Sequence, residues 1–388
     1  MSDVDVDLDL SKDQIEIKAW AREFAEKEIR PVAAEYDETE KVPWDLINKA
    51  AKAGFFGYPY PEEYGGLGLT SILTKCVILE ELAWGCAGVA DIIGATHLAG
   101  TPMMKMGSPE QLKKWISIIS NSDKANLAAY CLTEPEAGSD VANMRTSMRR
   151  DGDEYVINGR KCFITNGGIA EVYFVFATHD RSLRHKGISA FIIPAGTPGL
   201  SAGKKEKKLG TRCAHTGDVI FEDVRVPIEN RFSEEGKGFL GAMRALEEAR
   251  VTMAATALGV AQAAFDYALA YSKERKTFGQ PIAKHQAIAF MLADMATQIA
   301  AARALTWQAA RVADSGAPLN QIASMAKIMA SDVAVKVTTD AVQIFGGYGY
   351  IRDYPVEKLM RDAKIKQIYE GTNQIQRTVI AKELIGRD

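Results

Sequence analysis

The sequence predicts an α+β protein in which a β domain lies between two helical domains. Two observations lead to this prediction. Apolar side chains recur at helical spacing before residue 126 and after residue 234, and the segment between holds short runs rich in Val, Ile, Phe and Tyr, punctuated by Gly, Pro and Asn. This order lacks the strand–helix alternation of a doubly wound sheet. We therefore expect domains over residues 1–125, 126–234 and 235–388, the last of them an antiparallel four-helix bundle.

The N-terminal domain is expected to begin its first helix at a capping box. Ser11 is followed three residues later by Gln14, and an apolar helical pattern comes after them. Further helices are expected over residues 44–53, 71–84, 89–106 and 108–119.

The middle domain contains four clear strand signals. They cover residues 154–168, 171–180, 187–196 and 218–227. Asn158–Gly159 predicts a tight hairpin turn, because an Asn-Gly pair readily adopts positive φ angles. In the last domain, helices are expected at about 238–273, 283–314, 318–344 and 373–385.

Composition argues against several classes of protein. The chain has 388 residues and a net charge of −3, which gives no general attraction to nucleic acid or anionic membranes. Its five cysteines form no CxxC pair and its five histidines no HExxH motif, so we expect no metal site. The acidic first residues do not look like a leader, and no run of about 18 apolar residues is unbroken. We expect a cytoplasmic protein without a membrane anchor.

Known nucleotide-binding and hydrolase motifs are also missing. No GxxxxGK[ST] or GxSxG sequence occurs, and Gly66-Leu67-Gly68 follows no expected strand. Five other stretches concentrate Gly, Thr, Ser and charged residues beside apolar runs. They are YCLTEPEAGSD (130–140), KCFITNGG (161–168), RKTFG (275–279), QIFGGYG (343–349) and IYEGTNQIQ (368–376).

Each stretch alone is compatible with an ordinary turn or helix end. Together, in this order and spacing, they resemble the FAD-dependent acyl-CoA dehydrogenases from about residue 11 to residue 385. The resemblance includes the helical, β and helical order of domains, which is the fold of that family.

The resemblance implies FAD as cofactor, with its flavin between the β domain and the C-terminal bundle. A second group of residues would contact the FAD of a neighbouring subunit, which implies a homotetramer. The residues implied to bind FAD are Tyr130, Leu132, Thr133, Gly138, Ser139, Phe163, Thr165, Arg275, Thr277, Phe278, Gln286, Gln343, Gly347, Thr372 and Gln374.

By the same resemblance, Glu370 is the catalytic base. The α-proton of a thioester is only weakly acidic, so the base must lie against it in a dry site, where burial also raises the pKa of the carboxyl. Ala249 occupies the position at which some relatives carry the base instead. The acyl-CoA contacts implied are Asp91, Ser139, Glu247, Arg250, Tyr369 and Gly371.

Two residues depart from the usual family pattern. Phe163 stands where a tryptophan is usual, at the side implied to face electron-transferring flavoprotein, the expected electron acceptor. Asp91 places a carboxylate in the helix that lines the acyl pocket. It is interpreted either as a first-turn acid that favours the helix dipole or as a second base or acyl-selecting group.

The second interpretation resembles dehydrogenases of cyclohexane- or cyclohexene-carboxyl-CoA. Asp91 would then remove a ring proton in a 1,4-elimination. The alternative is ordinary α,β-dehydrogenation of a short straight or branched acyl-CoA with Glu370 as the sole base. Two other classes compete: an acyl-CoA oxidase, disfavoured by the short chain, and a non-enzymatic relative, disfavoured by Glu370 and the FAD motifs.

Overall fold

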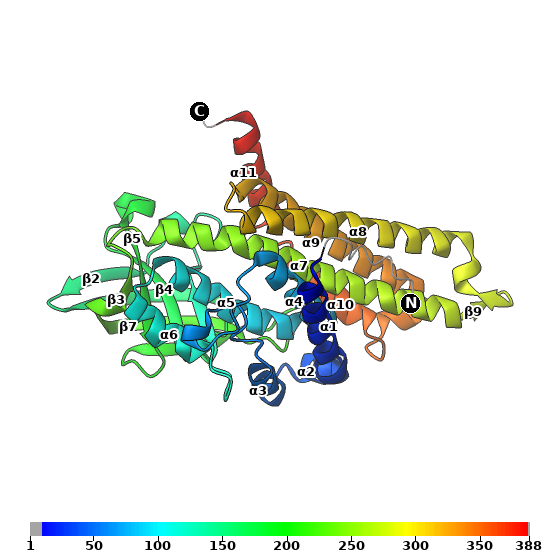
Figure 1. Ribbon diagram of the computed structural model, residues 1–388, viewed down its shortest axis with the longest axis horizontal. Helices are drawn as coiled ribbons and strands as arrows, with labels where there is room; N and C mark the ends of the chain where they lie inside the picture. Colours follow the sequence, from blue (N-terminus) through cyan, green and yellow to red (C-terminus); the bar gives the residue numbers. More distant parts are fainter. Residues whose placement is uncertain (1–9, 387–388) are drawn as a thin grey trace.

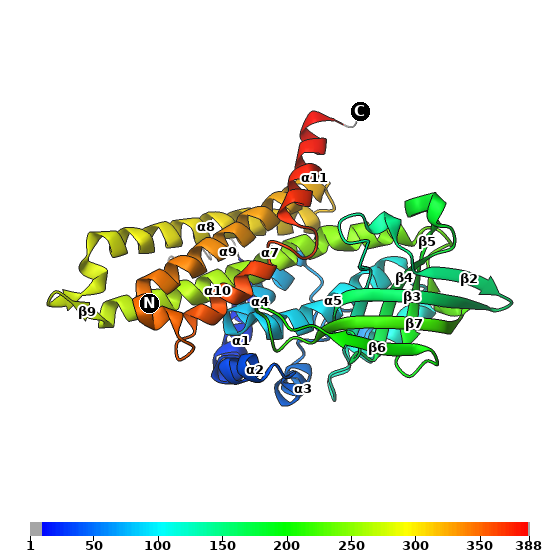
Figure 2. The same ribbon diagram turned by 180° about the vertical axis from the view of Figure 1, so that it is seen from behind.

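The computed structural model describes residues 10–386 and confirms the predicted order of domains. The β domain lies at one end of the molecule and the short strand β9 at the other (Figures 1 and 2). The long helix α7 (Gly238–Glu274) runs between these two ends, with the N-terminal helices against it. The acidic residues 1–9, on which the absence of a leader was predicted, lie outside the described part.

The N-terminal domain begins as its sequence predicts. The Ser11 hydroxyl accepts a hydrogen bond from the Gln14 backbone N–H at 3.2 Å, and the Gln14 side chain accepts one from the Ser11 N–H at 3.0 Å. This capping box starts α1. The helices of this domain are α1 (Lys12–Phe24), α2 (Ala33–Thr39), α3 (Trp44–Lys52), α4 (Ile72–Gly85), α5 (Ala87–Met106) and α6 (Pro109–Ile119).

One eight-stranded sheet forms the middle domain. Its strands run in the order β6-β7-β3-β2-β4-β5-β8, and β1 pairs in parallel with β4. The strands are β1 (Ala128–Cys131), β2 (Ser147–Asp151), β3 (Glu154–Thr165), β4 (Val172–Thr178), β5 (Ile188–Pro194), β6 (Leu200–Lys205), β7 (Thr216–Pro227) and β8 (Arg231–Phe232). Every residue of β4 is buried, which explains why its sequence is apolar without alternation.

The hairpin turn predicted at Asn158–Gly159 is wrong. Both residues lie inside β3, and the turn from β2 to β3 contains Gly152, with φ of 64°. A Cβ on Gly159 would lie 2.5 Å from the Thr146 hydroxyl oxygen. The glycine is therefore needed for close packing of neighbouring backbone and not for a turn.

The C-terminal domain consists of long helices and short connections. They are α7, the strand pair β9 (Lys276–Thr277) and β10 (Gln280–Pro281), α8 (Gln286–Asp314), α9 (Asn320–Phe345), α10 (Val356–Ile365) and α11 (Asn373–Ile385). Sequence analysis missed α10. The helix has only 10 residues, so its apolar pattern is short. The signal that could have located it is Pro355, because proline is common just before or at the start of a helix.

Helix α8 has an unusual surface. Among the described helices it is the one long and apolar enough to cross a membrane by length and composition, although only 17% of the apolar window is buried. Core helices of globular proteins pass the same test. Much of the apolar surface of α8 is therefore not buried within this chain.

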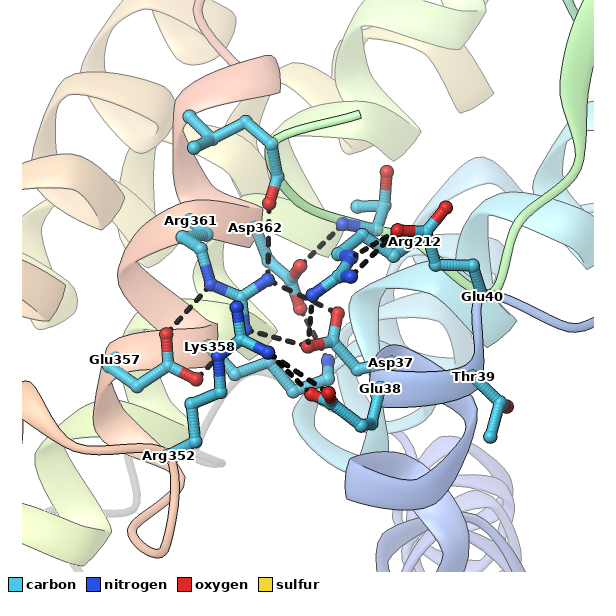
Figure 3. Close-up of polar contacts among 12 residues, drawn as sticks. Asp37, Glu38, Thr39, Glu40, Arg212, Arg352, Glu357, Lys358, Arg361 and Asp362 are labelled. Atoms are coloured by element: carbon cyan, nitrogen blue, oxygen red, sulfur yellow. Dashed lines mark hydrogen bonds and ion pairs between the residues drawn. The ribbon is translucent and has the colours of Figure 1, made fainter. Parts of the chain in front are cut away.

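A cluster of ion pairs joins the three domains (Figure 3). The buried carboxylate of Asp37, on α2, lies 2.6 Å from the Arg361 guanidinium of α10 and 3.8 Å from that of Arg212, which precedes β7. Arg212 also pairs with Glu40 at 2.6 Å. Each domain therefore contributes to one network, which fixes the relative positions of the domains on one side of the molecule.

Candidate active site

A cavity of about 260 Å³ lies where α5, the β1 and β3 ends, α7 and the segment before α11 meet. We call it the central cavity. It brings together residues that lie far apart in the sequence. Of the predicted site residues, those that line it are Asp91, Tyr130, Leu132, Thr133, Gly138, Ser139, Phe163, Thr165, Arg250, Tyr369, Glu370 and Gly371.

Glu370 is held in this cavity by an uncommon backbone conformation. Its φ is 54°, a left-handed angle that is rare for a residue with a side chain, and Gly371 follows at 92°. The Gln376 side chain donates to the carbonyls of Glu370 and Gly371 at 3.3 and 3.1 Å. Thr372 then starts α11, its hydroxyl accepting from the Ile375 N–H. These hydrogen bonds fix the turn that carries Glu370 at the central cavity.

The Glu370 carboxyl has the properties of a base. The side chain is partly open to the cavity, while its Oε2 is buried and has no hydrogen-bond partner among the described residues. Burial raises the pKa of Glu370 to about 7, and the nearby Asp91 charge acts in the same direction. The charges of Lys366, Lys327 and Arg250 act in the opposite direction. A carboxyl with a pKa near neutrality is a stronger base than an ordinary glutamate.

Asp91, in the first turns of α5, is not a free carboxylate. Its Oδ1 lies 2.8 Å from the Lys366 Nζ and accepts a hydrogen bond from the Tyr369 hydroxyl at 3.0 Å. The Lys366 side chain is fully buried, whereas the Asp91 side chain is 12% exposed and lines the cavity. Sequence reasoning missed Lys366. A carboxylate among apolar residues is itself a sequence signal for a buried cation nearby.

Two further cations lie close to Glu370. Arg250 is buried, donates from its Nη1 to Asn320 at 2.9 Å and leaves its Nε without a partner among the described residues. Lys327, on α9, is buried with its Nζ 2.7 Å from the Asn373 amide oxygen, and burial lowers the pKa of this lysine to about 8. Sequence analysis singled out Arg250 but not Lys327, which sits in an ordinary helical pattern.

A second hollow of about 590 Å³, which we call the side cavity, continues from the central one. Both are lined by Leu79, Leu98 and Glu370, so the base can be reached from either side. Glu248, whose carboxylate pairs with Lys105, lines the side cavity. The predicted substrate contact Glu247 lines neither; it is half-buried, and desolvation raises its pKa.

One wall of the central cavity is built by β1 and β3. The fully buried Lys161 Nζ donates to the Leu132 carbonyl at 3.1 Å and to the Glu134 carboxylate at 2.7 Å. The Asn166 amide donates to the carbonyls of Ile92 and Ala128, each at 3.1 Å. These buried hydrogen bonds fix the wall against α5.

This wall suits a planar aromatic cofactor. Phe163 has a φ of 56°, is 65% exposed and lines the cavity. The Tyr130 hydroxyl is buried without a partner among the described residues. A Cβ built on Gly138 would meet no atom within 4 Å, so the cavity is open there. An exposed ring, an unsatisfied hydroxyl and open space therefore fit the predicted flavin.

The remaining predicted FAD contacts lie elsewhere. Arg275, Thr277 and Gly347 line a separate hollow of about 410 Å³, the end cavity, close to β9. Figure 1 shows β9 at the end of the bundle away from the sheet. Phe278 is 96% exposed there. Gln286, Gln343 and Gln374 are exposed, and the Thr372 hydroxyl caps α11. None of these four residues lines the central cavity.

Residues 10–386 contain no group of three or more His, Cys, Asp or Glu side chains that could hold a metal ion. The ionisable side chains that line the central cavity are the carboxyls of Asp91 and Glu370, the guanidinium of Arg250 and the phenols of Tyr130 and Tyr369.

Comparison with family models settles the family. The N-terminal, middle and C-terminal domain models of acyl-CoA dehydrogenase match residues 11–122, 129–224 and 236–385. This chain belongs to the acyl-CoA dehydrogenase family. It is an FAD-dependent oxidoreductase, as the members of the family are.

Curated relatives and solved structures agree with this assignment. The short-chain specific acyl-CoA dehydrogenase of Clostridium acetobutylicum is 46% identical, over 98% of this acyl-CoA dehydrogenase and 100% of its own length. The mitochondrial short-chain enzyme of Bos taurus is 43% identical, over 95% and 89%. Butyryl-CoA dehydrogenase from Megasphaera elsdenii has a TM-score of 0.94 at 44% identity, over 97% of this chain and 99% of its own.

A further solved chain comes from work on the electron transferring flavoprotein of Acidaminococcus fermentans and flavin-based electron bifurcation. It has a TM-score of 0.95 at 47% identity, over 98% of this dehydrogenase and 100% of that chain.

Proposed function

We propose that this acyl-CoA dehydrogenase oxidises short straight or branched acyl-CoA thioesters between the α and β carbons, with Glu370 as the sole base. The observation that carries the proposal is the Glu370 carboxyl, which lines the central cavity with a buried, unpartnered Oε2. The relatives named short-chain specific and butyryl-CoA dehydrogenase support the size of the acyl group.

The residues of the central cavity have separate roles in the proposed reaction. Glu370 removes the α-proton, and exclusion of water keeps its carboxylate strongly basic. The Glu370 backbone N–H makes no hydrogen bond among the described residues, so it can donate to the thioester oxygen as negative charge develops there. The buried charge of Arg250 favours the same anion. Thr133, Phe163 and Thr165 would hold the flavin of FAD at this wall, where it would supply a hydride acceptor for the β carbon.

The cyclic-substrate hypothesis is not supported. The named relatives act on short acyl chains, and the Asp91 carboxylate is already paired with Lys366 and hydrogen-bonded to Tyr369. An ion-paired carboxylate is a weak base, because removing a proton from substrate would neutralise it and leave the buried Lys366 charge uncompensated.

Turnover of a panel of thioesters tests the substrate. We expect the highest kcat/KM with butyryl-CoA or a branched analogue of similar size, and much lower values with octanoyl-CoA and cyclohex-1-enecarboxyl-CoA. A preference for the cyclic thioester, lost in Asp91→Asn but kept in Glu370→Gln, would overturn the proposal in favour of a second base.

We also propose that FAD is shared between neighbouring subunits of a homotetramer. Arg275 and Thr277 line the end cavity, Figure 1 places β9 away from the sheet, and Phe278 is almost fully exposed. A neighbouring subunit that covers α8 would also explain its uncovered apolar surface.

Loss of the Arg275 charge should weaken FAD binding without unfolding the chain. Arg275→Ala removes a charge-assisted contact to phosphate, so we expect the FAD dissociation constant to rise by about 10- to 100-fold. Equilibrium dialysis measures the FAD dissociation constant, and light scattering measures the number of subunits. A monomer that retains FAD with unchanged affinity would contradict the sharing of the cofactor.

As electron acceptor we propose electron-transferring flavoprotein. Support comes from the similar chain solved in work on such a flavoprotein. Phe163 keeps an aromatic, largely exposed side chain at the position where the family usually has tryptophan.

A further inference from the structure

Two opposite charges lie beside the catalytic base and bond to each other. Lys366 and Tyr369 come from the same turn as Glu370, whereas Asp91 comes from α5, on another domain. The Lys366 Nζ is 2.8 Å from the Asp91 Oδ1 and also donates to the Tyr369 hydroxyl at 2.5 Å. No part of the Lys366 side chain is exposed. The pair therefore acts in a medium of low dielectric, where charges interact strongly.

The two charges act on Glu370 with opposite signs. The Lys366 ammonium stabilises the Glu370 carboxylate and lowers its pKa, whereas the Asp91 carboxylate repels it and raises its pKa. Because both partners are present, the two effects on the Glu370 pKa act against each other. Removing one partner would leave the effect of the other on the Glu370 pKa without this opposition.

We propose that Lys366 and Asp91 are positioning residues that set the proton affinity of Glu370, Lys366 lowering it and Asp91 raising it. This inference rests on the proposed role of Glu370 as the base. It assigns Asp91 a role different from both sequence interpretations, since the carboxylate neither takes a proton from substrate nor serves the dipole of α5.

The other charged and titratable groups around Glu370 do not duplicate this pair. Arg250 from α7 and Lys327 from α9 are cations that lower the pKa of Glu370, and no carboxylate is bonded to either among the described residues. The hydroxyls of Tyr130 and Tyr369 are buried phenols whose pKa values burial raises, so they stay neutral. The Lys105–Glu248 ion pair lines the side cavity and not the central one. Among the charged groups that shift the pKa of Glu370, only Lys366 and Asp91 are bonded to each other with opposite signs.

The test is the pH dependence of kcat/KM for butyryl-CoA, which reports ionisation in the free enzyme. A base works deprotonated, so the wild-type value should fall as pH drops through about 7. Asp91→Asn leaves Lys366 unopposed, so the acid limb should move down by about one pH unit. Lys366→Met leaves Asp91 unopposed, so the limb should move up by about the same amount. The double variant should return close to wild type.

Matched variants separate this effect from structural damage. Lys364→Met removes an exposed lysine two residues before Lys366 and should leave the acid limb of the pH profile unchanged. FAD content and thermal unfolding of each variant establish that it folds, and Lys366→Gln replaces Lys366→Met if the latter does not. The inference would be overturned if the acid limb moved in the same direction in both single variants or did not move in either. An equal movement of the limb in Lys364→Met would also overturn it.

Glu370→Gln distinguishes failure of this inference from failure of the proposed function. If Glu370→Gln is inactive and the pair variants show no opposed shifts, the pair has no tuning role while the base assignment stands. If Glu370→Gln keeps full activity, the base assignment fails and this inference fails with it.

Discussion

Replacing Glu370 by Gln is expected to lower kcat with butyryl-CoA by about 10²- to 10⁴-fold, the usual contribution of a general base. Glutamine fills the same space and keeps the left-handed turn, but it cannot accept the α-proton. The Gln376 hydrogen bonds to the carbonyls of residues 370 and 371 do not involve the replaced carboxyl, so the turn should persist. Stopped-flow reduction of the bound flavin measures the effect directly.

The control for this variant is its content of FAD and its affinity for CoA thioester. Both should stay close to wild type, because glutamine has nearly the size of glutamate and keeps the shape of the cavity. A variant that binds FAD and butyryl-CoA normally and still reduces the flavin at the wild-type rate would contradict the assignment of the base.

The largest loss of stability is expected from Lys161→Met. This change removes the cation that pairs with the buried Glu134, whose carboxylate would remain with only its two backbone donors, Arg145 and Thr146. Breaking a buried ion pair by removing one partner costs about 3–5 kcal/mol. Denaturant unfolding of the purified protein measures the free energy of unfolding. The Leu132 carbonyl also loses a donor, so looser FAD binding should accompany the loss.

Two comparisons make this prediction specific. Arg225→Met breaks the exposed ion pairs with Asp151 and Glu154 on the same sheet and should cost at most about 1 kcal/mol. The double variant Lys161→Met/Glu134→Gln, in which no charge is left unpaired, should recover part of the lost stability. Equal losses in Lys161→Met and Arg225→Met would contradict the importance of burial.

Patterns that depend on local geometry were predictable from the sequence. The helical period located the long C-terminal helices to within a few residues, and Ser11 with Gln14 predicted a capping box that forms as expected. The same reasoning failed at Asn158–Gly159. A glycine needed for close packing against Thr146 cannot be distinguished in the sequence from a glycine needed for a turn.

Contacts between distant segments could not be predicted in the same way. The motifs led to Glu370 and Asp91, and the structure places both on the central cavity. Lys366 lies only four residues before Glu370, yet its bond to Asp91 depends on how α5 packs against the turn after α10. Lys327 likewise approaches the site from α9, in a stretch with no unusual composition. Tertiary packing, which decides such pairs, leaves no periodic signal in the sequence.

Anaerobic titration of the purified FAD enzyme with butyryl-CoA tests the central claim most directly. Oxidation of a short acyl-CoA by Glu370 and FAD predicts that the flavin band bleaches in proportion to the thioester added, with formation of the α,β-unsaturated product. An enzyme whose flavin stays oxidised with butyryl-CoA and bleaches with cyclohex-1-enecarboxyl-CoA would contradict it.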